Sequence, residues 1–252
     1  MIPKLLTSLI VFTLICTSSL FGSSKATEYE VKLGRTVAAI ILGKNKQSTN
    51  NKLIKYVNLV GQTIVETSGR KDINYYFTIL ESDKANAVAA PGGYVFITSS
   101  LLNMIKNEAE LAGVLAHEIA HINEKHVFSK IYKEDDEGGD ILSSFLTAKN
   151  TSMTVAFNEL SNQALAMVLE KGLDEEDEYE ADLAAILYLQ NTGYKSQAYI
   201  DLISRLPVHK HTTHNKTHPK ISDRIASITA VYPKDTFTQG KLLKDRYKNE
   251  TK

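Results

Sequence analysis

Apolar residues along this 252-residue chain recur with two different periods. Over residues 27–69 they fall at intervals of three and four, as on one face of a helix, and a polar run at residues 44–51 interrupts them. This pattern predicts two helices with a break between them. Between residues 74 and 98 the period changes to two, which is typical of strands.

The alternating stretch divides into three predicted strands, at residues 76–80, 86–89 and 94–98. Pro91-Gly92-Gly93 joins the last two as a tight turn. Apolar residues return to helical spacing in residues 107–126, 158–173 and 175–189. We therefore predict an α+β fold, mainly helical, with a small antiparallel sheet directly before the helix at residues 107–126. The polar and charged residues 133–140 and 147–154 predict an irregular connection near that helix, either a lid or a plain surface loop.

The predicted helix at residues 107–126 contains an H-E-x-x-H sequence formed by His117, Glu118 and His121. Two histidines four residues apart project from one face of a helix and can share a metal ion. Glu118 lies about 100° round the helix, so it does not chelate with them but can take a proton from metal-bound water. This chemistry suits catalytic zinc, which lowers the pKa of its bound water to about 7. Because H-E-x-x-H also arises by chance on exposed helices, a third ligand has to be found elsewhere.

A second group of candidate residues begins the predicted helix at residues 175–189. Glu178 and Asp182 lie four apart on one face, and the sequence then becomes apolar, so that face would enter the core. A carboxylate at the metal and a second one that orients a ligand histidine are what a zinc site requires. Acidic residues are also favoured at any helix N-terminus, so these residues alone do not decide between the two readings.

The remaining histidines divide between one near the motif and four in a polar stretch. His126 would lie about 140° off the ligand face of a continuous helix, so we interpret it as structural or as support for a ligand. Residues 209–224 hold the other four of seven histidines, a pattern usual for solvated or adventitious metal sites. His218 differs because Pro219 stiffens its turn and a helix can begin soon after, but spacing assigns it no role.

Composition and the termini bear on location more than on chemistry. Lys plus Arg equals Asp plus Glu, 29 each, so no nucleic-acid footprint is indicated. Residues 1–26 have the layout of a secretory signal peptide, with an uncleaved anchor or a lipoprotein attached at Cys16 as alternatives. We expect an exported, periplasmic chain that has no disulfide and, once mature, no spanning helix. Its parts would be the signal peptide, a metallopeptidase domain at residues 27–231 and a frayed basic tail at residues 232–252.

Taken together, these residues resemble a family of zinc metallopeptidases that includes the CaaX prenyl protease, HtpX and BepA. The likeness spans about residues 56–228 and rests on four motifs in the family order. They are Asn86-Ala87-Val88-Ala89-Ala90-Pro91-Gly92-Gly93-Tyr94, the H-E-x-x-H sequence, Glu178-Tyr179-Glu180-Ala181-Asp182, and His218-Pro219 with Arg224. We expect a member without the membrane helices or repeat domain of those relatives.

The resemblance implies a gluzincin fold with one zinc ion and assigns roles to the matched residues. His117, His121 and Glu178 would bind the ion, Glu118 would be the general base and Asp182 would support a ligand histidine. Asn86, Ala87, Val88 and Ala89 would form the edge strand that pairs with a substrate backbone. His218 would occupy a fourth position on the ion as a latch, or otherwise bind the substrate or transition state, and Arg224 would anchor the following helix.

The predicted function is that of a zinc metalloendopeptidase for exported or misfolded envelope proteins, that is, protein quality control. Its partners would be polypeptide substrates and envelope or outer-membrane assembly proteins. One alternative is a latent zinc-bound chaperone-like or adaptor protein, against which the intact Glu118 argues. Another is a non-peptidase zinc hydrolase such as an amidase, which would not need the edge strand. The longer motif H-E-x-x-H-x-x-G-x-x-H is excluded, since Glu124 and Val127 stand where it requires Gly and His.

Overall fold

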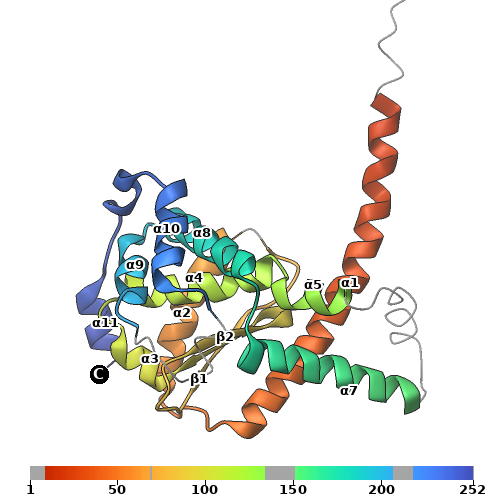
Figure 1. Ribbon diagram of the computed structural model, residues 1–252, viewed down its shortest axis with the longest axis horizontal. Coiled ribbons are helices and arrows are strands. Elements are labelled where there is room, and N and C mark those ends of the chain that lie inside the picture. The colour runs from red at the N-terminus through yellow and green to blue at the C-terminus, as the bar shows by residue number, and fades with distance from the viewer. Residues whose placement is uncertain (1–8, 69, 134–150, 207–217, 252) are drawn as a thin grey trace, which may run out of the picture.

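The computed structural model describes residues 9–68, 70–133, 151–206 and 218–251. It opens with α1 (Leu9–Lys44) and α2 (Asn51–Thr67), which confirms the two predicted helices and the break between them. The side chain of Asn50 accepts a hydrogen bond from the backbone N–H of Leu53 and so starts α2. The N-terminal part of α1 projects away from the rest of the molecule (Figure 1). None of the described helices is both long and apolar enough to cross a bilayer.

The three predicted strands are present as β1 (Tyr76–Leu80), β2 (Ala87–Ala90) and β3 (Tyr94–Thr98), in the spatial order β1-β3-β2. β2 and β3 form an antiparallel hairpin through the 3₁₀ turn η1 (Pro91–Gly93). A Cβ at Gly93 would lie 1.9 Å from the backbone oxygen of Asn74, so only glycine fits this turn. β1 and β3 are parallel, so the prediction of a wholly antiparallel sheet is wrong. Apolar and polar residues alternate in the same way in parallel and antiparallel strands, so this pattern could not distinguish the two kinds of pairing.

The two outer edges of this sheet are unlike each other. Along β1, the side chains of Asn58 and Gln62 on α2 donate to the backbone oxygens of Phe77 and Tyr75, each at 3.0 Å. The backbone N–H of Ser48 donates to Ile79 O at 2.9 Å and continues this cap. Along β2, the register with β3 turns the backbone groups of alternate residues outward, and these are the groups of Ala87 and Ala89. Within the part of the chain that the structure describes, the edge of β2 is therefore the one left for a further strand.

The rest of the described chain is helical and surrounds one central helix. The elements are α3 (Ser99–Met104), α4 (Glu108–Asn123), α5 (His126–Lys133), α7 (Thr151–Ala166), the π-helical turn η2 (Met167–Lys171), α8 (Glu175–Asn191), α9 (Gln197–Ile203), α10 (Ile221–Val231), η4 (Lys234–Phe237) and α11 (Lys244–Glu250). α4 carries the H-E-x-x-H sequence through the middle of the molecule and contacts α2, β2, α8 and α9 (Figure 1). Its residues from Glu108 to Ile122 are all buried.

Two predictions about the helices need adjustment. The helix expected at residues 158–173 is divided between α7, which begins at Thr151 within the stretch expected to be irregular, and η2. The lid or surface loop expected before it falls mainly at residues 134–150, outside the described residues.

The apolar core of the described residues has two parts. The larger cluster surrounds α4, and a second cluster joins α1, α5, α7 and η2 to the β2–β3 hairpin.

The prediction that the C-terminal tail is frayed is wrong, because α11 is hydrogen-bonded to the core. The buried hydroxyl of Tyr247 on α11 donates to the backbone oxygen of Leu102 at 2.7 Å. Arg246 donates to both carboxylate oxygens of Glu108, the first residue of α4, which also accept from Tyr56 and Tyr194 at 2.7 and 2.6 Å. Burial opposes ionisation of Glu108, but these hydrogen bonds outweigh it and lower the pKa of the carboxyl. α11 is thus fastened to the start of the central helix.

Candidate metal centre

Three side chains from α4 and α8 converge on one point. The Nε2 atoms of His117 and His121 are 3.0 Å apart, as expected for residues one turn apart. Glu178 on α8 places Oε2 at 3.5 Å from His117 Nε2 and Oε1 at 3.6 Å from His121 Nε2. A tetrahedral zinc with ligand bonds of 2.0–2.1 Å separates its ligand atoms by roughly 3.3 Å. The donor set and spacing therefore fit a single zinc ion, and all three residues are buried.

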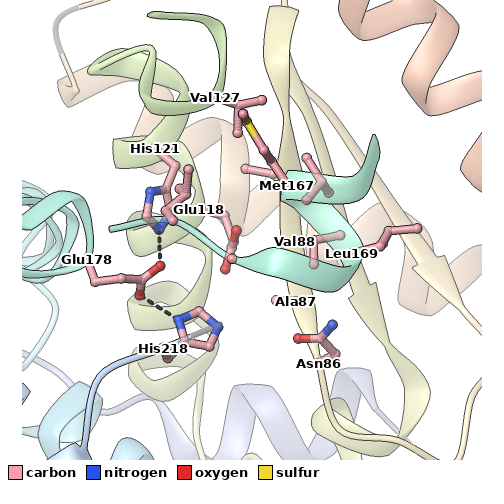
Figure 2. Close-up of a pocket in the computed structure, with 14 residues that line it drawn as sticks. Asn86, Ala87, Val88, Glu118, His121, Val127, Met167, Leu169, Glu178 and His218 are labelled. Atoms are coloured by element: carbon pink, nitrogen blue, oxygen red, sulfur yellow. Dashed lines mark hydrogen bonds and ion pairs between the residues drawn. The ribbon is translucent and has the colours of Figure 1, made fainter. Parts of the chain in front are cut away.

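His218 also reaches this centre, from the segment directly before α10. Its Nδ1 lies 2.5 Å from Glu178 Oε2, and Figure 2 shows Glu178 between His121 and His218. One ligand atom from each of His117, Glu178 and His218 lies within 4.8 Å of the others, which is also a metal-binding arrangement. His209, His211 and His214 lie outside the described residues.

The back of His117 faces a buried group of charged residues. Its Nδ1 lies 3.1 Å from Asp182 Oδ1, although not in line for a regular hydrogen bond. Arg224 donates to both carboxylate oxygens of Asp182, at 2.8 and 2.6 Å, and the hydroxyl of Tyr199 donates to the same carboxylate at 2.6 Å. Burial would raise the pKa of Asp182, but Arg224 and His117 lower it below its usual range. Asp182 therefore stays ionised behind His117.

The two histidines of the motif differ in their pKa values. Burial lowers the pKa of His117, but Asp182 and Glu178 outweigh it and raise the pKa to about 9. Burial and the charge of His117 lower the pKa of His121 well below its usual value. Since a metal binds the neutral imidazole, occupation of the centre would release the proton of His117.

Glu118 points from α4 toward the space between the centre and β2 (Figure 2). Burial raises the pKa of its carboxyl, although the charges of His117 and His218 act in the opposite direction. A carboxylate with a raised pKa is a stronger acceptor for a proton from water. Glu118 thus lies beside the three converging side chains but outside the group of atoms that could bind a metal.

Two cavities meet at Glu118. The smaller, of about 50 Å³, is lined by Asn86, Ala87, Val88 and Ala89 on one side and by residues of η2 on the other. Figure 2 shows Val88 beside η2. The larger, of about 700 Å³, lies on the other side of Glu118 and is lined by apolar residues of α3, α4 and α9 as well as by His218 and Arg224. The structure thus brings the predicted edge strand beside the predicted base and ligands.

Two further residues belong to the surroundings of this centre. Helix α4 ends before Lys125, which has a left-handed backbone with φ of 58°, and the chain turns back so that His126 Nδ1 lies 2.8 Å from His121 Nδ1. The angle of 140° assumed a continuous helix and is wrong for that reason. Tyr199, which donates a hydrogen bond to Asp182, could not be found from the sequence, because a single tyrosine in a helix outside any motif gives no signal.

The chain is similar to a family of peptidases and to several known proteases. Residues 51–231 match peptidase family M48. The beta-barrel assembly-enhancing protease of Escherichia coli K12 is 25% identical over 193 residues, which are 73% of this chain and 39% of that protein. The same-named protein of Yersinia pestis is 29% identical over 160 residues, 61% of this chain and 32% of that protein. The mitochondrial metalloendopeptidase OMA1 of Schizosaccharomyces pombe is 29% identical over 189 residues, 71% and 52% of the two chains. The match thus covers about a third to a half of these relatives.

Proposed function

Because this chain belongs to peptidase family M48 and is a metalloprotease, we propose that its metal is zinc, bound by His117, His121 and Glu178, and that Glu118 is the general base. The observation that carries the proposal is the convergence of these three side chains, with 3.0 Å between the two Nε2 atoms and 3.5 and 3.6 Å from them to the two carboxylate oxygens of Glu178. These separations suit the bond lengths of zinc to nitrogen and oxygen. Asp182 and Arg224 support this set from behind His117.

In the proposed reaction, a zinc ion held by His117, His121 and Glu178 would supply a Lewis acid that polarises the scissile carbonyl. Glu118 accepts a proton from the attacking water and passes it to the leaving amine. Its buried position beside the ligands keeps this transfer within a short distance and away from bulk solvent. The ionised Asp182 stabilises the orientation of His117 throughout.

We further propose that β2 holds the substrate by strand addition. Two features support this: the β1 edge is capped by α2 and Ser48, and the outward backbone groups of Ala87 and Ala89 face the cavity beside Glu118. Main-chain pairing would supply affinity without reading the sequence of the substrate. Because η2 packs against β2 at this cavity, a substrate strand added to β2 would lie next to η2.

For the biological role we propose an exported enzyme, directed by a signal peptide at residues 1–26, that degrades misfolded envelope proteins. Support comes from the bacterial relatives named as beta-barrel assembly-enhancing proteases. The alternative of a latent zinc-bound chaperone-like or adaptor protein is favoured by one observation, the contact of His218 with Glu178. If His218 occupies a position on the ion, it has to leave before water can bind.

The test combines metal analysis with proteolysis of an unfolded substrate such as casein. The wild type should hold about one zinc per chain, and Glu118→Gln should keep the zinc while losing activity on the order of a thousandfold or more. The exposed Glu124→Gln at the end of the same helix is the matched control and should keep full activity. Undiminished cleavage by Glu118→Gln would reject the mechanism.

The variant His218→Ala tests whether the chain is an active protease or a latent zinc-bound chaperone-like protein. If His218 is a latch, the variant should cleave casein faster than the wild type at unchanged zinc content. A variant that loses activity instead would assign His218 to the substrate or transition state. A wild type and a His218→Ala variant that both hold zinc and cleave nothing would favour the chaperone-like alternative.

A further inference from the structure

The two histidines of the motif are supported by different chemistry. Behind His117 stands the carboxylate of Asp182, which Arg224 and Tyr199 hold in place. Behind His121 stands another imidazole, with 2.8 Å between His121 Nδ1 and His126 Nδ1. The Nε2 atom of His126 in turn lies 3.3 Å from Glu180 Oε2. His126 therefore connects the buried ligand to a carboxylate at the surface.

The hydrogen atoms of this chain of contacts follow from the proposed zinc site. A neutral imidazole carries one N–H, and a histidine that offers the lone pair of Nε2 to a metal must carry its hydrogen on Nδ1. His121 Nδ1 can then donate only to the lone pair of His126 Nδ1. His126 must carry its own hydrogen on Nε2, and Glu180 is the acceptor within reach. Each tautomer is thus determined by its neighbour.

The backbone between the two histidines is shaped for this contact. The N–H of Glu124 donates to Ala120 O at 2.9 Å and that of Lys125 to Ile122 O at 3.2 Å, which closes the last turn of α4. Lys125 then adopts its left-handed conformation, which is unfavourable for a residue with a side chain. α5 begins at the next residue with His126, which is 4% exposed and is followed by the buried residues Val127 and Phe128. The strained backbone of Lys125 thus directly precedes His126, the residue that contacts the proposed ligand His121.

We propose that His126 is a positioning residue for the metal, which accepts the Nδ1–H of His121 and so keeps the lone pair of His121 Nε2 directed at the ion. The inference rests on the proposed zinc site and adds to it a support that acts through the ligand. Outer partners of ligand histidines fix the tautomer and the ring orientation, and their loss typically weakens metal binding by 10- to 100-fold.

The experiment measures zinc affinity of the purified chain by competition with a chelator. His126→Leu removes the acceptor at similar volume and should raise the dissociation constant for zinc by about 10- to 100-fold. His126→Asn places a carbonyl oxygen near the position of Nδ1 and should stay within about threefold of the wild type. Nitrogen NMR of the zinc-loaded wild type should show His121 with its hydrogen on Nδ1, and the melting temperatures of the metal-free variants should agree.

Three outcomes would overturn the proposal. His126→Leu could bind zinc as tightly as the wild type, the Asn and Leu variants could lose affinity equally, or the NMR spectrum could place the hydrogen of His121 on Nε2. His117→Ala serves as the control for the site itself and should lose zinc. If the wild type binds no zinc, the proposed function fails together with this inference, whereas zinc in the wild type with no effect of His126→Leu rejects the inference alone.

Discussion

On one side of the cleft, α4 and α8 carry imidazoles and carboxylates that are held by further side chains, whereas on the other side β2 presents Ala87, Val88, Ala89 and its own backbone. The first side depends on buried charge: Asp182 is fully buried and Arg224 nearly so. The second side carries no charged residue along β2. On the proposed function, the reaction thus depends on buried charged side chains, whereas substrate binding depends on the backbone of a strand.

This difference decides how each side should respond to substitution. A buried ion pair loses several kcal/mol when one partner is removed, because the other charge remains without water or a counter-charge. A strand that binds through its backbone tolerates changes of side chain but not loss of an N–H group. Substitutions behind the ligands should therefore have larger effects on stability, and those in β2 should have smaller effects confined to substrate binding.

The largest effect is expected from Arg224→Leu, which leaves the carboxylate of Asp182 without its main partner. We expect the free energy of unfolding to fall by about 3–5 kcal/mol. Urea unfolding in the presence of a chelator measures it without a contribution from bound metal. Thr229→Ala, exposed on the same helix, is the control and should change stability by less than about 0.5 kcal/mol. A loss below 1 kcal/mol for Arg224→Leu would show that Asp182 does not depend on this partner.

A smaller effect, and one that depends on pH, is expected at the start of α4. The pKa of Glu108 is lowered in the folded chain, so its stabilising contribution is complete above the unfolded value of about 4.5 and is lost as pH falls through the folded value. Glu108→Gln should be less stable than the wild type at pH 7 by about 1–3 kcal/mol, and the difference should narrow below pH 4.5.

Urea unfolding of both proteins between pH 7 and 3 checks this expectation. The exposed Glu81→Gln is the control and should follow the wild type at every pH. A constant difference between Glu108→Gln and the wild type over the whole range would mean that the ionisation of Glu108 does not stabilise the fold.

On the β2 side, we expect Ala87→Pro to weaken substrate binding because proline lacks the outward N–H. One lost hydrogen bond of about 0.5–1.5 kcal/mol corresponds to a two- to tenfold higher KM, with kcat and zinc content nearly unchanged. Ala87→Ser keeps the N–H at the same half-buried position and is the matched control. Equal KM values for the two variants would place the substrate away from this backbone group.

The smallest effect is expected at the opposite edge of the sheet. Asn58→Ala removes the hydrogen bonds to Phe77 O and Ile54 O and should lower the free energy of unfolding by about 1 kcal/mol. KM should not change, since β1 is not proposed to bind substrate. A shift of KM in Asn58→Ala comparable to that of Ala87→Pro would remove the distinction between the two edges.

What could be predicted from the sequence is what depends on local spacing. The helix with His117 and His121, the turn at Gly92 and Gly93 and the helical start of α8 follow from periods of three to four residues, of two residues, or from turn chemistry. The site residues were placed by motif, and their geometry in the structure is compatible with the roles proposed.

What could not be predicted depends on pairing between distant residues or on a single backbone angle. The contact of Arg246 with Glu108 joins residues 138 positions apart, and no periodicity reports it. The parallel pairing of β1 with β3 is likewise set by the path of the chain and not by the strands themselves. The spacing could not predict which residue His126 contacts, because one left-handed residue, Lys125, ends the helix that the sequence pattern continues.

The sealing of the β1 edge by Asn58, Gln62 and Ser48 also limits what can happen to a captured chain. A sheet with two open edges could store an unfolded polypeptide on one edge and cut it on the other, and could also join with a second sheet into an aggregate. Here β2 is the edge that remains, and its four residues span about 13 Å directly beside Glu118. On the proposed function, capture of a chain by strand addition and its delivery for cleavage are one event, and a segment already paired within a folded protein escapes both.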